Sequence, residues 1–257
     1  TSISLILTIG SLSLLIFPQT YLLIKTNILE NLLATPLQLA PGLFLIACNL
    51  GSNKTKLANA NIVPVIDGIL YAQYKFNDYK SADDLAINKI TFNNEDTTEN
   101  NIKQSSIFWV RNQINTPALD KSPEEFIQNV NNLLESSDVN VKVFDQKWLE
   151  ENNFGGVLGV AKGSDRAPYL VVGKYNEKAK YQIALIGKGV LFDSGGYSLK
   201  SPAGMETMKT DMSGAASAWG VINLVARTNQ DIGLTVYTPI VENMVSGSAI
   251  RPGDVLK

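Results

Sequence analysis

The sequence predicts an α/β protein with a smaller amino-terminal α/β domain and a second α/β domain that holds a mostly parallel sheet. From Asn115 onward, apolar segments of strand length alternate with segments of helical spacing, which is typical of strands joined by helical crossovers. A polar, acidic run at Asn93–Asn101 separates this part from the residues before it. A glycine-dense run, Gly187–Gly214, lies between a predicted strand and a predicted helix, where α/β proteins place ligands.

These observations give the expected domain boundaries. The amino-terminal domain covers residues 1–95, a linking helix covers 96–114, and the second domain covers 115–257. In the first domain, Gly42–Leu50 is expected to form a buried strand, and Ile62–Tyr74 has apolar residues near helical spacing.

The apolar segment Thr1–Lys25 allows three interpretations. A signal peptide is disfavoured, because no basic region precedes the apolar run and no clear cleavage site follows it. A transmembrane helix is disfavoured because Pro18 and Gln19 interrupt a run that falls short of a full span. We favour one or two buried strands, whose length the run fits, and a frame-shifted start is a further alternative.

Capping residues and apolar spacing predict the elements that follow. A helix over Ile102–Ile114 should stop at Asn115-Thr116-Pro117, since the residue before a proline disfavours helix. Ser122-Pro123-Glu124-Glu125 predicts another helix start, with proline in the first turn and acidic side chains at the positive end of the dipole. Further elements are expected in this order: a strand at Val139–Phe144, a short helix at Gln146–Asn152, strands at Pro168–Tyr175 and Tyr181–Ile186, a helix at Asp211–Arg227 and a strand at Gly233–Val241.

Composition excludes several classes of function. The net charge of −2 gives no indication of a nucleic-acid partner. Cys48 is the only cysteine and histidine is absent, which excludes disulfide frameworks, cysteine-rich metal sites, histidine-ligated zinc and histidine bases. The glycine-dense run matches neither nucleotide-binding glycine motif. Catalysis must therefore depend on carboxylates, lysines, a metal, or hydroxyl groups.

Two aspartates in the glycine-dense run, Asp193 and Asp211, are candidate ligands of a divalent metal. On residue type alone, a structural role is the better interpretation, since loop aspartates usually cap turns or helices, and Asp211 stands where an N-cap would. Lys188 and Lys200 are ordinary solvated lysines on the same reasoning. Met208 fits a core position and a pocket position equally well.

The same run resembles the metal-site segment of the leucyl aminopeptidases, the M17 or cytosol aminopeptidase family. Spacing and identity agree over nearly the whole run, and the resemblance is continuous from about Asn61 to Lys257. The matching positions are Gly187-Lys188-Gly189, Phe192–Gly196, Lys200, Met205, Met208, Asp211-Met212 and Gly214–Ala216, followed by Glu242-Asn243-Met244 and Arg251–Val255.

The resemblance implies removal of leucine-like amino-terminal residues from peptides at a site with two divalent metal ions, Mn²⁺ or Zn²⁺. It implies that Asp193 bridges the metals and that Lys188 and Asp211 are further ligands; a lysine can ligate only when neutral, which burial beside a cation favours. Lys200 would hold the substrate carbonyl oxygen as charge develops there, and Met208 would line the pocket for the first side chain. Bicarbonate as a further cofactor and a cytoplasmic homohexamer of the full-length protein are also implied. Peptide substrates are the expected partners; the net charge indicates no nucleic-acid partner, and a membrane partner is disfavoured.

One part of the family pattern is absent. The family carries its remaining metal ligands and an anion-binding arginine in Asn-Thr-Asp-Ala-Glu-Gly-Arg, shortly after the stretch that matches Arg251–Val255. This chain ends at Lys257. We therefore expect a fragment with an incomplete catalytic domain that is inactive by itself. The alternative is a truncated or degenerate non-catalytic protein with a partial metal site.

Overall fold

The computed structural model describes residues 4–9, 67–68, 70–79 and 97–256. The expected strand at Gly42–Leu50 lies outside the described residues, as do residues 62–66 and 69 of the segment Ile62–Tyr74. In the described part of that segment, residues 67, 68, 70 and 71 are helical, as its apolar spacing indicates. The chain divides into two compact units, one of residues 1–13 and 105–257 and the other of residues 14–104. The candidate site lies wholly in the first unit. The boundaries at 95 and 114 stay predictions.

The second unit contains the beginning of helix α4, Thr98–Asn115. Side chains in its first turns are tied to the short segment before it: Asn100 Nδ2 donates to Asp67 Oδ1 at 2.6 Å, and Gln104 Nε2 donates to the carbonyl of Leu70 at 2.8 Å. The helix expected at Ile102–Ile114 is confirmed. The expected polar linker Asn93–Asn101 is partly wrong, because its last residues already belong to α4.

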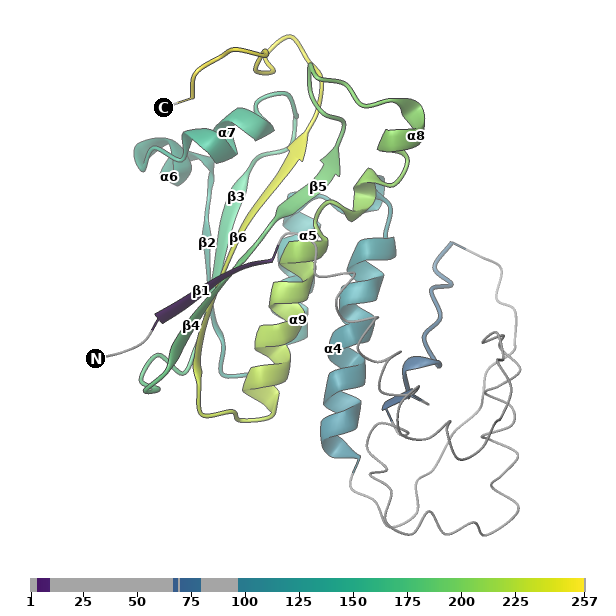
Figure 1. Ribbon diagram of the computed structural model, residues 1–257, viewed down its shortest axis with the longest axis vertical. Coiled ribbons are helices and arrows are strands. Elements are labelled where there is room, and N and C mark those ends of the chain that lie inside the picture. Colours follow the sequence, from purple (N-terminus) through teal and green to yellow (C-terminus); the bar gives the residue numbers. More distant parts are fainter. Residues whose placement is uncertain (1–3, 10–66, 69, 80–96, 257) are drawn as a thin grey trace, which may run out of the picture. The chain divides into compact units, whose positions relative to one another are not determined.

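The first unit is built on one sheet with the strand order β1-β4-β6-β3-β2, and β5 also pairs with β6 (Figure 1). Its strands are β1 (Ser4–Ile9), β2 (Asn140–Phe144), β3 (Tyr169–Tyr175), β4 (Gln182–Gly187), β5 (Gly189–Asp193) and β6 (Gly233–Asn243). The α/β class is confirmed. The sheet is mostly parallel, as predicted: β1, β4, β5 and β6 run parallel, while β3 is antiparallel to β6 and β2 to β3.

The short connection between β3 and β4 explains why these two strands run in opposite directions. Only residues 176–181 join β3 to β4. A parallel crossover needs a dozen or more residues, so β4 must run opposite to β3.

Helices cover both faces of the sheet (Figure 1). They are α5 (Pro123–Leu134), α6 (Gln146–Glu151), α7 (Gly155–Ala161), α8 (Pro202–Met205) and α9 (Ser213–Arg227), with 3₁₀ turns η3 (Ala118–Asp120) and η4 (Met208–Thr210). Side chains of β3 alternate, so Val171 joins the main core with α5 and α9, whereas Leu170 and Val172 pack against α6 and α7. Trp219 of α9 is fully buried and lies over Gly173.

The apolar start of the chain is described only in part. β1 confirms a strand inside Thr1–Lys25, and the rest of that segment lies outside the described residues. Among the residues that are described, the structure has no helix long and apolar enough to cross a membrane.

The start of α5 is a capping box, as its sequence indicates. Ser122 Oγ accepts from the backbone N–H of Glu125 at 3.1 Å, and Glu125 Oε2 accepts from the N–H of Ser122 at 2.7 Å. Each bond satisfies a backbone donor that the helix leaves free. The predicted start at Pro123 is therefore confirmed.

Replacing Ser122 by alanine should lower the free energy of unfolding by about 1 kcal/mol, because the N–H of Glu125 loses its acceptor. Urea denaturation measures the change. Ser136→Ala, at an exposed position past the other end of α5, is the matched control and should change the free energy by less than about 0.5 kcal/mol. Equal effects of the two variants would contradict a capping role for Ser122.

Candidate metal centre

Lys188 interrupts what would otherwise be one long strand. β4 and β5 keep the same register with β6 on either side of it, so Lys188 lies opposite Pro239, which has no N–H for the ladder. The flanking glycines are required by close backbone contacts. A Cβ on Gly187 would lie 2.6 Å from the carbonyl oxygen of Gly214, and one on Gly189 would meet the carbonyl oxygen of Pro239. Lys188 is therefore held between α9 and β6.

Asp193 stands at the end of β5, after an irregularity in the ladder. The register with β6 shifts between Val190 and Asp193, which brings Asp193 opposite Asn243. Bulges of this kind re-aim side chains next to functional sites. Asp193 Oδ1 accepts from Asn243 Nδ2 at 2.7 Å and from the N–H of Gly195 at 3.0 Å, and Oδ2 is paired with the ammonium of Lys200.

These contacts determine the charge of Asp193. Burial raises the pKa of its carboxyl, but the hydrogen bonds from Lys200, Gly195 and Asn243 together outweigh burial and lower the pKa below its usual value. Asp193 is therefore a firmly ionised carboxylate. The loop that carries Lys200 closes back on the strand end, since the N–H of Lys200 donates to the carbonyl of Ser194 at 3.0 Å.

Asp211 lies between η4 and α9, close to Lys188. Lys188 Nζ is 3.1 Å from Asp211 Oδ2. The geometry of this ion pair is not that of a hydrogen bond, and Oδ2 is buried without a hydrogen-bond partner. Burial raises the pKa of Asp211, Lys188 opposes that shift, and the negative charge of Asp193 adds to it.

The structural role considered for Asp211 from the sequence is wrong. The N-cap of α9 is Met212, and no side chain caps this helix. Asp193 does accept one bond of its own loop, from the N–H of Gly195. The side chain of Lys188 is 49% exposed, which agrees with its interpretation from residue type as an ordinary surface lysine. Its role as a metal ligand stays a prediction.

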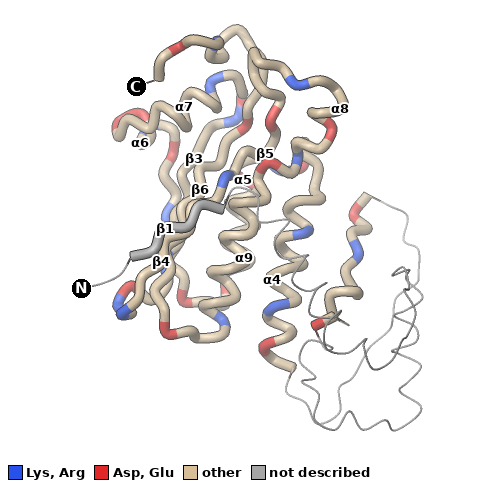
Figure 2. Tube along the Cα trace, in the orientation of Figure 1, with Lys and Arg blue, Asp and Glu red and all other residues tan. Residues whose placement is uncertain are grey.

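The two lysine–aspartate pairs are neighbours, since the charges of Asp193 and Lys200 both act on Asp211. Figure 2 marks the acidic and basic positions along the trace around β5 and α9. A lysine stands beside each carboxylate, where a cation would otherwise balance the charge. Two carboxylates, one of them with a buried oxygen that makes no hydrogen bond, fit a hard or borderline divalent cation. Within the described residues no three or more Asp, Glu, Cys or His side chains gather to hold a metal, so the donor set is a partial shell.

Lys200 and Met208 are the two remaining residues that the sequence predicts for this site. Lys200 is bound to Asp193, as described above, and is about one-third exposed. Met208 is the first residue of the 3₁₀ turn η4, and its side chain is half-buried. The sequence therefore brings Lys188, Asp193, Lys200 and Asp211 together, and the substrate-binding roles of Lys200 and Met208 stay predictions.

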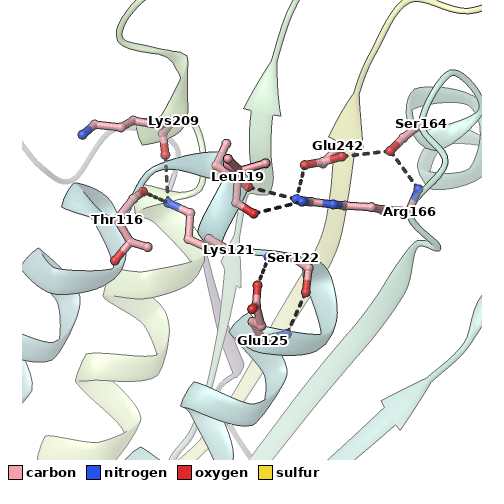
Figure 3. A network of polar contacts seen from close by, with 10 residues as sticks. Thr116, Leu119, Lys121, Ser122, Glu125, Ser164, Arg166, Lys209 and Glu242 are labelled. Atoms are coloured by element: carbon pink, nitrogen blue, oxygen red, sulfur yellow. Dashed lines mark hydrogen bonds and ion pairs between the residues drawn. The ribbon is translucent and has the colours of Figure 1, made fainter. Parts of the chain in front are cut away.

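Lys121, a buried lysine that no sequence pattern identifies, supports the turn η4. Lys121 is fully buried, and its ammonium donates to the carbonyls of Gln113, Thr116 and Lys209 at 2.7, 3.1 and 3.1 Å (Figure 3). In return, Lys209 Nζ donates to the carbonyl of Asn115 at 2.8 Å. The two lysines thus tie the end of α4 to the turn that leads into Asp211.

Sequence reasoning also misses the side chains around the end of β6. Arg166 Nη1 lies 2.8 Å from Glu242 Oε1, and Ser164 Oγ donates to Glu242 Oε2 at 2.9 Å (Figure 3). Glu242 immediately precedes Asn243, the donor to Asp193. The signal that could have found Asn243 is its place directly after a strand that ends beside Asp193.

Comparison with known proteins gives consistent matches. The family model described as "Cytosol aminopeptidase family, catalytic domain" matches residues 108–257. A probable cytosol aminopeptidase of Rhodococcus jostii (strain RHA1) is 34% identical over 223 residues, which is 80% of this chain and 44% of the relative. A probable cytosol aminopeptidase of Streptomyces avermitilis is 43% identical over 148 residues, 57% of this chain and 29% of the relative.

Solved structures give the same result. The cytosol aminopeptidase from Coxiella burnetii superposes with a TM-score of 0.72 at 26% identity, covering 100% of this chain and 62% of that one. The bottromycin maturation enzyme BotP in complex with Mn has a TM-score of 0.67 at 29% identity, covering 76% of this chain and 42% of that one. The chain thus spans less than half the length of the curated relatives it matches.

Proposed function

The chain belongs to the cytosol aminopeptidase family, and on that premise we propose that it supplies part of a two-metal centre that releases leucine-like amino-terminal residues from peptides. The observation that carries this proposal is the meeting of the Lys200–Asp193 and Lys188–Asp211 pairs at the ends of β5 and η4. Asp193, Lys188 and Asp211 would hold the ions. A neighbouring structure named as a complex with Mn supports Mn²⁺ as one of the ions, and Zn²⁺ is the alternative.

In the proposed reaction, the residues of this chain would have different roles. Divalent cations polarise a peptide carbonyl and lower the pKa of a bound water. Asp193 and Asp211 would hold the cations. The ammonium of Lys200, which pairs with Asp193 in this structure, would hold the substrate carbonyl oxygen, where negative charge develops. Met208 would offer an apolar wall to the first side chain.

The donor set of the described residues is partial, so we propose that the 257-residue chain binds a divalent ion weakly and does not turn over substrate by itself. The competing possibility is a protein whose partial metal site never becomes catalytic. A homohexamer of the full-length protein, a cytoplasmic location, peptide substrates and bicarbonate as a further cofactor belong to the same proposal and rest on family membership.

Isothermal titration with Mn²⁺ and an assay of leucine p-nitroanilide test this proposal. The metal-free 257-residue protein should bind Mn²⁺ with heat that Asp211→Asn reduces, because the variant removes one charged ligand. p-Nitroaniline release should not exceed the rate in buffer with Mn²⁺ alone. Absence of Mn²⁺ binding would overturn the metal site, and metal-dependent hydrolysis would overturn the claim of a partial centre.

A further inference from the structure

Asn243 is held in one position by its backbone and by its neighbours. Its carbonyl accepts from the N–H of Ser194 at 3.0 Å, which joins the end of β6 to the residue after Asp193. Glu242, directly before it, is buried and bound by Arg166 and Ser164 (Figure 3). The strand end is therefore fixed from both sides, and the side chain of Asn243 projects from a rigid support.

The amide group of Asn243 has a defined orientation. The amide presents its NH₂ group to Asp193 Oδ1, at 2.7 Å, because a carboxylate paired with the ammonium of Lys200 offers only acceptors. On the other side of the amide, Gly196 passes with φ of +63°, and a Cβ there would lie 3.0 Å from Asn243 Oδ1. Glycine at this position leaves the amide its space and tolerates the left-handed backbone.

The contact makes the two oxygens of Asp193 unequal. Oδ1 accepts two directed hydrogen bonds, from Asn243 and Gly195. Oδ2 is held by the ammonium of Lys200, a partner that a cation can replace. The carboxylate is thus fixed at Oδ1 and available at Oδ2.

We propose that Asn243 is a positioning residue that orients the carboxylate of Asp193 so that Oδ2 faces the metal. This inference rests on the proposed function, because it presumes a metal at Asp193. Hydrogen-bond partners of metal ligands fix ligand orientation, and their loss costs about 10- to 100-fold in metal affinity. A bulge in β5 matters for this reason: without the register shift, Asp193 would not lie opposite Asn243.

The test compares Mn²⁺ dissociation constants of the 257-residue protein and its Asn243→Leu variant, measured by the electron paramagnetic resonance of free Mn²⁺. Leucine keeps the size of asparagine and removes the donor, so binding should weaken by about 10- to 100-fold. Asn243→Ser is a second variant, for use if the leucine variant does not fold, because serine adds no apolar bulk. It should weaken Mn²⁺ binding by a similar factor. Asn131→Leu, on the exposed surface of α5, is the control and should leave the constant unchanged.

A second readout separates positioning from general stability. The visible absorption bands of Co²⁺ bound to Asn243→Ser should be shifted from those of Co²⁺ bound to the wild type. The bands report the geometry of the ligands, and in the variant the carboxylate of Asp193 should have moved. Unchanged bands together with an unchanged Mn²⁺ constant would overturn the inference while leaving the metal site intact. Failure of the wild-type protein to bind Mn²⁺ would instead overturn the proposed function, and the inference with it.

Discussion

Replacing Asp193 by asparagine is expected to weaken Mn²⁺ binding by more than about 100-fold. Loss of an outer hydrogen-bond partner already costs about 10- to 100-fold, and Asp193 is itself the proposed ligand. The lowered pKa of Asp193 means that the wild-type site offers a full negative charge near neutral pH, which the amide cannot supply. The amide oxygen can still accept from Gly195, so the loop keeps one of its supports.

Titration of both proteins with Mn²⁺ measures the effect. Asp231→Asn is a matched control: Asp231 is exposed and precedes the opposite end of β6, and its loss should leave the Mn²⁺ constant unchanged. Chemical denaturation without metal should show that Asp193→Asn remains folded. A variant that is folded and binds Mn²⁺ as the wild type does would show that Asp193 is not a ligand.

Local patterns predict the elements of the first unit well, because their signals are carried by neighbouring residues. The capping box at Ser122 and the alternation at Val139–Phe144 are examples, and both elements form where expected. Helix α7 is not predictable in this way. Its sequence, Gly-Gly-Val-Leu-Gly-Val-Ala, has poor helix propensity, and the helix forms because Val157 and Leu158 pack against β3.

In the candidate site, too, some features follow from the sequence and others follow only from the fold. The spacing of Lys188, Asp193, Lys200 and Asp211 is a sequence property, and the fold brings these four together. Which lysine pairs with which aspartate depends on the interruption at Lys188 and on the bulge in β5, and both are properties of the ladder with β6. The role of Asn243 depends on that register too, so residue type alone could not identify it.

Lys121 presents a different case, in which a buried charge replaces a missing helix bond. The carbonyl of Gln113, near the end of α4, would normally accept from the N–H four residues later, but that residue is Pro117, which has none. Lys121 Nζ donates to this carbonyl at 2.7 Å. The last turn of α4 also has no basic side chain of its own, so the Lys121 amine is the group that brings hydrogen-bond donors to this end of the helix.

This arrangement makes stability depend on pH in a definite direction. Burial, and secondarily the charge of Lys209, lowers the pKa of Lys121 to about 7 in the folded protein. The unfolded chain has a lysine pKa of about 10.4, so between these values the unfolded state binds more protons than the folded state. The contribution of Lys121 to the free energy of unfolding should therefore rise as pH increases from about 7 to about 10.

Lys121→Met tests both properties, since methionine fills a similar volume and donates no hydrogen bond. At pH 9 the variant should be less stable by roughly 2 kcal/mol, because the carbonyls that the Lys121 amine bonds in the folded protein lose their donor. That deficit should shrink by about 1 kcal/mol per pH unit toward pH 7, where the wild-type lysine becomes a buried charge. Urea denaturation at several pH values measures it, with Lys178→Met, an exposed lysine, as the control that should stay within about 0.5 kcal/mol. A deficit that does not change with pH would mean that the lysine keeps the same charge in both states, and that its carbonyl partners offset the cost of burying it.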